Sequence, residues 1–461
     1  MRIGIRSAAL AALVSSLLVL AACGGGDDTD GAGGGGGGGA AEANGDATAT
    51  AACKPAPAGT KVTLKYSSWV PGAQKVVDLW NKENPDIQVD YREVPSGQAG
   101  SYKNYINAIK AGRVDDLGFV EFEYLPTFRL QGGLQDIGGC AGVKEVASKF
   151  VPWAWKQATF GENGPVYAIP HDTAAMAYFY RKDLFDKHGL QPPKTWTEFY
   201  ELGRKVKQYG GRLVNVSAYA TGFFPGLVWQ KGGQWFQQDG SGWKVSIDNP
   251  ATREVAEYWQ KILDEDLATK YAILGEEYNR AVNTDRMWGM IGGSWMAKLL
   301  EAASPKTKGD WRVAELPQWT AGEQTDGNWG GGNVFVFKGS KHPAEAAKFA
   351  VWLNSHPAAQ ELNVANGGIF PATAGATQSV PALQKGTEFL GGQQQWQLFD
   401  QLSARVPSSW IWGPTQLQLD QDLQDGVSAA LGNKRKLTEV FADVQAKTVA
   451  AMKDQAISVG E

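Results

Sequence analysis

Apolar and polar positions alternate along the chain with two different periods. Residues 62–66 and 87–91 alternate at every second position, which predicts two strands. Residues 73–83 and 102–111 place their apolar side chains at helical spacing, and residues 117–120 form a short apolar run. These elements predict the order β-α-β-α-β, which is typical of a parallel sheet with helices on its faces.

A second set of elements begins near residue 168. The pattern predicts strands over 176–180 and 333–337, and helices that begin at Arg181, Trp196, Ala251 and Ala344. Thr195 precedes one of these helices, and its hydroxyl can accept the backbone N–H of Glu198 as a cap. Asn249 and Pro250 open another, with proline at the first turn, where a missing N–H costs nothing.

The first residues predict an export signal. Arg2 and Arg6 precede an apolar run over residues 8–20, which is shorter than the ~20 residues that span a bilayer. The run ends in Leu-Ala-Ala-Cys at residues 20–23, and small residues before a cysteine match the bacterial lipobox. We expect a signal peptide over 1–22 and a lipid on Cys23, with ordinary signal-peptidase cleavage as the alternative.

Residues 24–52 consist almost wholly of Gly, Ala, Thr, Asp and Asn. Such a segment has no apolar face to bury and predicts a flexible coil. A Gly-rich chain of this length spans about 30 Å on average. We therefore interpret residues 23–53 as a tether between the lipid and the folded part.

Charge and length limit the classes of partner and the number of domains that we expect. The formal net charge is −4, and no basic stripe is present to neutralise phosphates, so a nucleic acid partner is not expected. The folded part has roughly 400 residues, which predicts two domains rather than one core.

The sequence has three cysteines, and if Cys23 carries the lipid, Cys53 and Cys140 are left. In an oxidising compartment we expect these two to form a disulfide; two free thiols are the alternative.

Catalytic signatures are missing from the sequence. It has four histidines, and no HExxH, CxxC or GxSxG motif is present. The glycines at 330–332 lack the Lys-Ser/Thr of a phosphate loop, so we interpret them as a tight backbone crossing. The sequence predicts no cofactor and no metal.

Tryptophan is unusually frequent, with 18 residues. Trp80, Trp259 and Trp352 lie in predicted helices and are expected in the core. Others lie in loops beside glycine, proline or other small residues, where a flat indole face can pack on a pyranose ring. These are Trp69, Trp295, Trp329, Trp410 and Trp412. The alternative for each is that it caps the core; several together favour a carbohydrate cleft.

Carboxylates accompany these aromatics. Glu121 and Glu123 end a predicted strand, and Asp172 follows Ile-Pro-His. Ionised carboxylates accept strong hydrogen bonds from sugar hydroxyls. A carboxyl pair also suits glycoside hydrolysis, but residues i and i+2 of one strand point the same way and do not flank a bond. Binding is the favoured role.

Beyond the tether the chain resembles the extracellular solute-binding proteins of sugar ABC importers, the group that includes maltose-binding protein. The matching segments are LWNKENPDI (79–87), GLQDI (133–137), YAIP (167–170), FYRKDLF (179–185), PKTWTE (193–198), MIGGSW (290–295) and AEAAKF (344–349). Each is modest alone, but their order extends over most of the folded part.

The resemblance implies an α/β fold like that of periplasmic binding proteins, with two lobes joined by a multi-strand hinge. The lobes would comprise residues 54–170 plus 330–370 and residues 171–329 plus 371–461. The resemblance places a sugar-stacking ring at Trp295, a cleft carboxylate at Glu123, and Asp172 just past the hinge. Maltose-binding protein has a stacking aromatic where this chain has Val120, so a maltodextrin preference is not implied. The ligand-binding residues expected in full are Trp69, Glu121, Glu123, Asp172, Phe224, Trp295, Trp329, Gly330, Trp410 and Trp412.

The expected function is capture of a sugar or oligosaccharide and its delivery to the permease subunits of an ABC importer. The protein would act as a monomer outside the cytoplasm, held at the membrane through its N-terminal lipid. Two other classes remain open. One is a secreted carbohydrate-processing enzyme that uses Glu121, Glu123 or Asp172. The other is a binding protein for a non-sugar solute, such as a peptide or a polyol phosphate.

Overall fold

The computed structural model describes residues 53–159, 164–240 and 242–460. The predicted signal peptide, Cys23 and the tether up to residue 52 lie outside the described residues. Within the described part, no helix combines the length and the apolar character needed to cross a bilayer. The same residues contain no cluster of three or more His, Cys, Asp or Glu side chains that could hold a metal ion.

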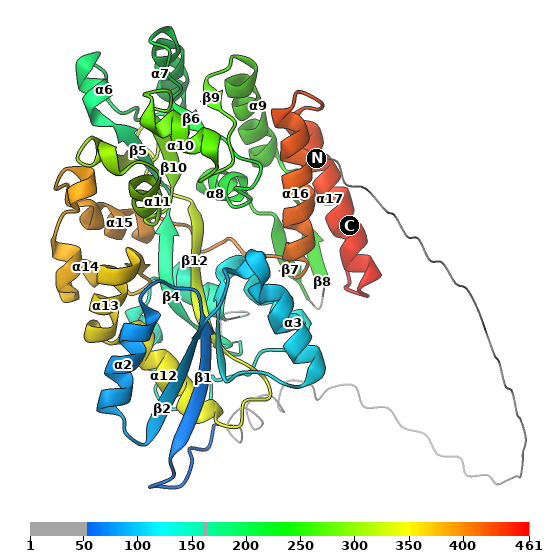
Figure 1. Cartoon of the computed structure of the whole chain (residues 1–461). Coiled ribbons are helices and arrows are strands. Elements are labelled where there is room, and N and C mark those ends of the chain that lie inside the picture. Colours follow the sequence, from blue (N-terminus) through cyan, green and yellow to red (C-terminus); the bar gives the residue numbers. More distant parts are fainter. Residues whose placement is uncertain (1–52, 160–163, 241, 461) are drawn as a thin grey trace, which may run out of the picture. The chain divides into compact units, whose positions relative to one another are not determined.

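The larger sheet has six strands in the order β13-β4-β12-β3-β1-β2 (Figure 1). Its strands are β1 (Val62–Ser68), β2 (Ile87–Glu93), β3 (Leu117–Glu121), β4 (Ala168–Ala175), β12 (Asn328–Val336) and β13 (Phe370–Pro371). β1 runs parallel to β2 and β3, as the sequence predicts. β12 is antiparallel to β3 and β4, so the sheet is mixed.

Both faces of this sheet are covered by helices. Along β12, Val334 and Val336 belong to one hydrophobic cluster, and Phe335 and Phe337 belong to another. Successive side chains of a strand point to opposite faces, so the two clusters lie on the two sides of the sheet. α2 (Ala73–Glu83), α12 (Pro343–Ser355) and α13 (Pro357–Gly367) contribute to the first cluster, and α3 (Tyr102–Ala111) and α4 (Leu125–Leu130) to the second.

A smaller antiparallel sheet has the order β10-β5-β11, formed by β10 (Gly289–Gly292), β5 (Ala177–Arg181) and β11 (Trp311–Glu315). Two short pairs join β6 (Val214–Asn215) to β9 (Ala268–Thr269) and β7 (Phe236–Asp239) to β8 (Gly242–Val245). The other helices of the described residues are α5 (Pro152–Ala158), α6 (Lys182–Lys187), α7 (Trp196–Gln208), α8 (Phe223–Gln230), α9 (Pro250–Asp264), α10 (Glu276–Asn283), α11 (Met296–Ala303), α14 (Ala376–Ser379), α15 (Gln395–Ala404), α16 (Gln416–Leu431) and α17 (Leu437–Asp454).

The chain passes directly between the two sheets. β4 ends at Ala175 in the larger sheet, and β5 begins at Ala177 in the smaller one. The chain returns between the end of β11 and the start of β12. Because β12 enters the larger sheet from the smaller one, it is antiparallel to β3 and β4. The larger sheet is therefore mixed and not all parallel, as the sequence pattern had predicted it to be.

The predicted helix caps are confirmed. The Thr195 hydroxyl accepts the Glu198 N–H at 3.1 Å, and the Asn249 side chain accepts the Thr252 N–H at 3.0 Å. The Glu198 carboxylate accepts from the backbone N–H of Lys194 at 2.7 Å rather than from that of Thr195.

Cys53 and Cys140 form a disulfide, as the sequence predicts, with Cα atoms 4.8 Å apart and 87 positions between them in sequence. Nearby, the Ala56 N–H donates to Glu345 on α12 at 2.6 Å. These two links hold the start of the folded part against the larger sheet and its helices.

Candidate functional site

Two predicted carboxylates lie on either side of one glycine. In the larger sheet, Gly332 of β12 pairs with Glu121 at the end of β3 and with Asp172 in β4. The Gly332 N–H also donates to the Asp172 carboxylate at 3.1 Å. Sheet pairing therefore brings together two acidic residues that are 51 positions apart in sequence.

The position of Glu123 differs from the sequence prediction. β3 ends at Glu121, and Glu123 lies in the 3₁₀ turn η2 (Phe122–Tyr124), so the two glutamates are not on one strand. The turn forms because pairing with β12 stops at Glu121. Glu123 still lies close enough to Glu121 for their charges to interact.

A fourth carboxylate comes from α16. Asp420 is 6% exposed and accepts hydrogen bonds from the Tyr124 hydroxyl at 2.5 Å and from the Gln416 amide at 2.9 Å. We call Glu121, Glu123, Asp172 and Asp420 the carboxyl cluster.

Burial controls the titration of the carboxyl cluster. Desolvation raises the pKa of Asp172 to about 7 and that of Asp420 to about 7. Desolvation, with the charges of Asp172 and Asp420, raises the pKa of Glu121 to about 8. Desolvation and the charges of Glu121 and Asp420 raise the pKa of Glu123 well above its ordinary value. Within the described part of the chain, the charges that shift these four groups are all those of other carboxyls.

Trp295 and Trp329 form an aromatic pair next to the carboxyl cluster. Their rings are 5.1 Å apart and edge to face, and the Trp295 indole N–H donates to the Trp329 carbonyl at 3.1 Å. Both side chains are only partly buried. Trp329 and Gly332 are three residues apart on β12, so their backbones lie within about 10 Å of each other, and Gly332 pairs with Glu121 and Asp172 of the cluster.

The glycines between them allow a close backbone crossing, as predicted. Gly331 has φ +77°, and a Cβ there would lie 2.6 Å from the Asp172 carbonyl oxygen. Gly330 has φ +96°, and a Cβ there would lie 3.1 Å from the Trp295 indole nitrogen. Gly330 therefore lies beside the aromatic pair.

Trp69 is connected to the carboxyl cluster through Tyr102. It follows β1 and packs edge-on against Phe119 at 5.0 Å and against Tyr102 at 5.7 Å. The Tyr102 hydroxyl in turn accepts the backbone N–H of Glu121 at 3.2 Å. Trp69 is partly buried and lies one aromatic ring away from the carboxyl cluster.

Three predicted aromatic residues are buried in this structure. Trp410 is 0% exposed and stacks on Trp229 at 5.4 Å, and Trp412 is 5% exposed and lies edge-on to Trp410. Phe224 is 2% exposed and packs against Phe223 and Phe441. Trp410 and Phe224 therefore belong to the core here and present no open ring face. A role for them in ligand contact remains a prediction.

Two buried polar atoms in or beside the carboxyl cluster have no hydrogen-bond partner among the described residues. They are Oε2 of Glu121 and Oε1 of Gln416, whose amide nitrogen donates to Asp420. Buried polar groups are normally paired with protein or with water. Carboxyl and amide oxygens accept hydrogen bonds, so these two atoms suit a ligand that carries hydroxyl groups.

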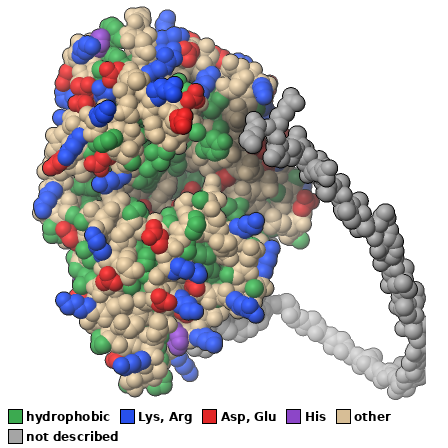
Figure 2. All heavy atoms as spheres, in the orientation of Figure 1, with side chains coloured by type: hydrophobic (Ala, Val, Ile, Leu, Met, Phe, Trp, Pro, Cys, Tyr) green, Lys and Arg blue, Asp and Glu red, His purple; other side chains and the backbone are tan. Residues whose placement is uncertain are grey.

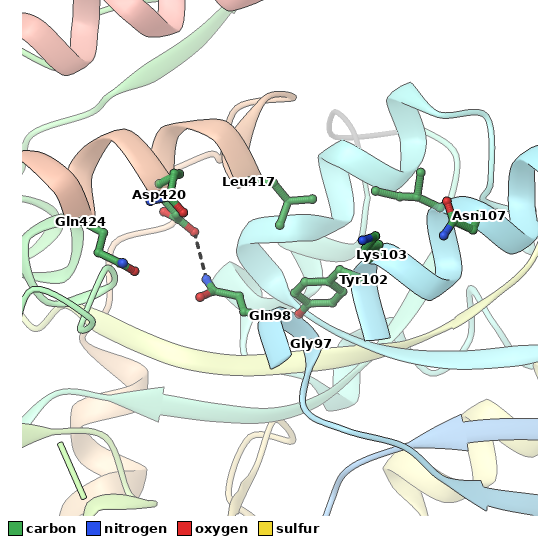
Figure 3. A pocket seen from close by; sticks show the side chains of 10 residues that line it. Gly97, Gln98, Tyr102, Lys103, Asn107, Leu417, Asp420 and Gln424 are labelled. Atoms are coloured by element: carbon green, nitrogen blue, oxygen red, sulfur yellow. Dashed lines mark hydrogen bonds between the residues drawn. The ribbon is translucent and has the colours of Figure 1, made fainter. Parts of the chain in front are cut away.

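An open groove leads to this cluster. It lies between α16 and α3 with η1 (Gly97–Ser101), has a volume of about 440 Å³, and is lined by Gly97, Gln98, Tyr102, Lys103, Ile106, Asn107, Leu417, Asp420, Gln421 and Gln424 (Figure 3). Gln98 points across the groove to Asp420, with its amide nitrogen 3.5 Å from a carboxylate oxygen. The face shown in Figure 2 is hollowed across its middle, and hydrophobic side chains gather around the hollow.

Sequence reasoning missed Asp420, Tyr124 and Gln98. A signal for Asp420 was present, because it shares a helical stripe with Leu423 and Val427 at spacings of three and seven. A carboxylate on an apolar stripe is costly to bury without partners and therefore marks a position of interest. The positions of Tyr124 and Gln98 depend on contacts with α16 that no local pattern encodes.

A family model described as "Bacterial extracellular solute-binding protein" matches residues 66–360, more than half of the chain. The "Lactose-binding protein" of Rhizobium radiobacter is 27% identical over 254 residues, which cover 53% of this chain and 58% of that protein. The "Arabinooligosaccharide-binding protein" of Halalkalibacterium halodurans is 24% identical over 62% of this chain and 65% of its own length. The chain thus spans about three fifths of these two relatives.

Solved structures share the fold over a larger part. The galacto-N-biose-/lacto-N-biose I-binding protein of Bifidobacterium longum superposes with a TM-score of 0.78 at 24% identity, covering 87% of this chain and all of that one. The ABC transporter associated binding protein of B. animalis subsp. lactis Bl-04 gives a TM-score of 0.75 at 25% identity, covering 87% of this chain and all of its own. The fold is therefore the α/β fold of periplasmic-type binding proteins, as the sequence predicts, and the chain belongs to the bacterial extracellular solute-binding protein family.

Proposed function

We propose that this protein binds a sugar or oligosaccharide at the Trp295–Trp329 pair and the carboxyl cluster, and delivers it to the membrane subunits of an ABC importer. The observation that carries the proposal is the proximity of two half-buried indole rings to buried carboxylates along β12. Indole faces pack on the apolar face of a sugar ring, and carboxylates accept its hydroxyls. Binding in the micromolar range needs only about −8 kcal/mol, which such contacts can supply.

The ligands named for similar proteins support a sugar. They include lactose, arabinooligosaccharides, lacto-N-biose and β-1,6-galactobiose. Because the family is one of solute-binding proteins, a carbohydrate-processing enzyme is not supported.

Other relatives are named as binding proteins for sn-glycerol 3-phosphate, including one that is 29% identical over 30% of this chain. The site argues against that ligand here. The carboxyl cluster holds four acidic groups whose pKa values are raised by burial, and Lys103 is the one cation among the described residues that line the groove beside it. A phosphate would lose its hydration beside these carboxyls with that single cation to compensate it. A neutral ligand suits this site better.

We further propose two lobes, 54–170 plus 330–370 and 171–329 plus 371–461, hinged where β4 continues into β5 and β11 into β12. The site draws on both proposed lobes, with Glu121 from the first and Trp295 and Asp420 from the second, while Asp172 lies on β4 of the larger sheet just before the hinge. A ligand that contacts both lobes binds their closed arrangement better and shifts the equilibrium toward it.

Membrane attachment through a lipid on Cys23 is part of the proposal. Replacing Cys23 by alanine should release the protein from membranes without changing its affinity for a sugar. Mass spectrometry of the membrane-extracted N-terminal peptide provides the direct readout. An unmodified Cys23 in that peptide would contradict the lipid anchor.

A thermal-shift screen of the purified protein against mono- and oligosaccharides tests the binding function. A true ligand at 100 times its dissociation constant should add about 2.7 kcal/mol of stability. Trp295→Ala should abolish this shift and change the unliganded melting temperature little, because the ring is only partly buried.

Trp243→Ala is the matched control. Trp243 is also partly buried but lies on β8, and its ring packs on Phe236 rather than on the site. The ligand shift should persist in this variant. A shift that persists in Trp295→Ala would contradict the proposed site, and the absence of any sugar-induced shift in the wild-type protein would contradict the proposed function.

A further inference from the structure

One carboxylate links side chains from opposite walls of the groove between α3 and α16. Asp420 on α16 accepts a hydrogen bond from the Tyr124 hydroxyl at 2.5 Å, and the Gln98 amide nitrogen lies 3.5 Å from the same carboxylate oxygen. The Gln98 amide also contacts the Tyr124 hydroxyl, and Figure 3 shows its side chain reaching toward Asp420. We call Gln98, Tyr124 and Asp420 the polar bridge.

The two donors of the polar bridge belong to the first proposed lobe. Tyr124 ends η2, directly after β3, and its ring packs on Tyr102 of α3 with the ring centroids 4.6 Å apart. Gln98 lies in η1, which continues into α3. Both side chains are therefore attached to the larger sheet and its helices.

The acceptor, Asp420, is attached to the second proposed lobe. α16 packs closely on α17, where a Cβ on Gly426 would lie 2.5 Å from Cγ1 of Val440. α17 is bonded in turn to α9, since the Leu437 N–H donates to the Gln260 side-chain oxygen at 2.9 Å. Asp420 is therefore fixed to the body that contains α9, on the other side of the proposed hinge from its two donors.

Another hydrogen bond between the proposed lobes lies at the hinge. The Trp153 indole N–H donates to the Ser403 carbonyl at 2.9 Å, and the Ser403 hydroxyl donates to that of Thr173, near the end of β4, at 3.2 Å. A rotation about the hinge changes distances least at the hinge strands, so this contact can persist when the lobes separate. The polar bridge joins η1 and η2 to α16, none of which is a hinge strand, so separation of the lobes breaks it.

Burial makes the bond between Tyr124 and Asp420 strong enough to affect the hinge equilibrium. Tyr124 is 2% exposed and Asp420 is 6% exposed. A hydrogen bond to an ionised carboxylate is stronger than one between neutral groups, and a buried setting strengthens it further. Loss of such a bond should change the ratio of closed to open protein roughly tenfold or more.

We propose that the polar bridge is a latch, which holds the two lobes together through the protein's own side chains. This inference rests on the two hinged lobes of the proposed function and adds a protein contact that favours their closed arrangement. The latch raises the population of the closed arrangement before a sugar binds. A larger population of the binding-competent arrangement raises the apparent affinity for every ligand by the same factor.

Distances between spin labels on the two lobes test the latch. Lys110→Cys on α3 and Ala446→Cys on α17 provide exposed labelling positions, and Figure 1 shows both helices on the side of the molecule where α16 lies. Cys23→Ala removes the remaining unpaired cysteine of the sequence. Double electron–electron resonance of the sugar-free protein is recorded at pH 8, above the pKa of about 7 that burial gives Asp420.

The wild-type bridge should give a main population at short distances. Tyr124→Phe removes the hydroxyl and keeps the ring, so it should raise the ratio of long to short distances roughly tenfold. Gln98→Ala should shift the ratio in the same direction by a smaller factor, and Gln98 is exposed, so its loss should leave the fold intact.

Tyr105→Phe is the matched control. Tyr105 is buried in the same hydrophobic cluster as Tyr124, but its hydroxyl donates to the Ser67 carbonyl at 3.2 Å, within the first proposed lobe. This variant should leave the distances unchanged. A sugar-free wild-type protein with long distances alone would overturn the latch, and so would a Tyr124→Phe protein with the wild-type distances. The measurement contains no sugar, so its result is separate from that of the thermal-shift screen.

Discussion

Replacing Asp420 by asparagine should stabilise the unliganded protein at high pH. Asp420 is 6% exposed, and its pKa is raised by desolvation to about 7, whereas an unfolded aspartate titrates near 3.9. The folded state therefore binds more protons than the unfolded state between those two values, and stability falls as pH rises from about 4 to about 7. Asparagine keeps the shape of the side chain and never ionises.

The difference between the two pKa values gives a magnitude. For a single group with these pKa values, the raised pKa of Asp420 lowers the free energy of unfolding by about 1.5 kcal/mol at pH 5 and by about 4 kcal/mol at pH 8. The stability of Asp420→Asn relative to wild type should therefore rise by about 2–3 kcal/mol between pH 5 and pH 8. The Tyr124 hydroxyl can still donate to the asparagine oxygen. In the wild-type structure the Gln416 side-chain oxygen has no hydrogen-bond partner among the described residues. If the Gln416 amide group flips in the variant, this oxygen can accept a hydrogen bond from the NH₂ group of the asparagine.

Urea unfolding of both proteins at pH 5 and pH 8 measures this change. Asp425→Asn is the matched control, because Asp425 is an exposed carboxylate on the same helix. It should leave the pH dependence of wild type unchanged. If Asp420→Asn shifts stability by the same amount at both pH values, the buried-carboxylate reasoning is wrong.

Three further variants test how the fold is held together. Cys53→Ser with Cys140→Ser should lower the free energy of unfolding by roughly 4–5 kcal/mol, because the disulfide closes a loop of 87 residues; insensitivity of the wild-type protein to reductant would contradict this. Trp410→Ala should cost about 3–5 kcal/mol in denaturant unfolding, since the ring is 0% exposed, and a loss below about 1 kcal/mol would argue for an open ring face. Gly331→Ala should cost more than about 1 kcal/mol, because φ is +77° and a Cβ would meet the Asp172 carbonyl; the melting temperature reports it, and an unchanged value would contradict the close crossing.

Local patterns predicted much of the fold. The helix at Ala73–Glu83 was predicted with the bounds found, and the cap at Thr195 forms as predicted, because both depend on residues adjacent in sequence. The antiparallel direction of β12 was not predicted. It depends on the chain leaving the larger sheet for the smaller one and returning, which is a property of the topology and not of any one segment.

The site was predictable only in part. Trp295 and Trp329 lie together next to Asp172, where loop aromatics beside small residues indicated a binding cleft. Trp410 has the same local signature but is covered by Trp229, which lies 181 positions away in sequence. Asp420 was missed because its neighbours in the carboxyl cluster come from β3, η2 and β4. Long-range packing decides both cases.

The most direct test of the central claim is a crystal structure of the protein with the oligosaccharide that gives the largest thermal shift. We expect a sugar ring in van der Waals contact with Trp295 or Trp329, and a hydroxyl hydrogen-bonded to at least one of Glu121, Asp172 and Asp420. A ligand bound elsewhere on the protein, with these indoles and carboxylates free of contact, would contradict the account.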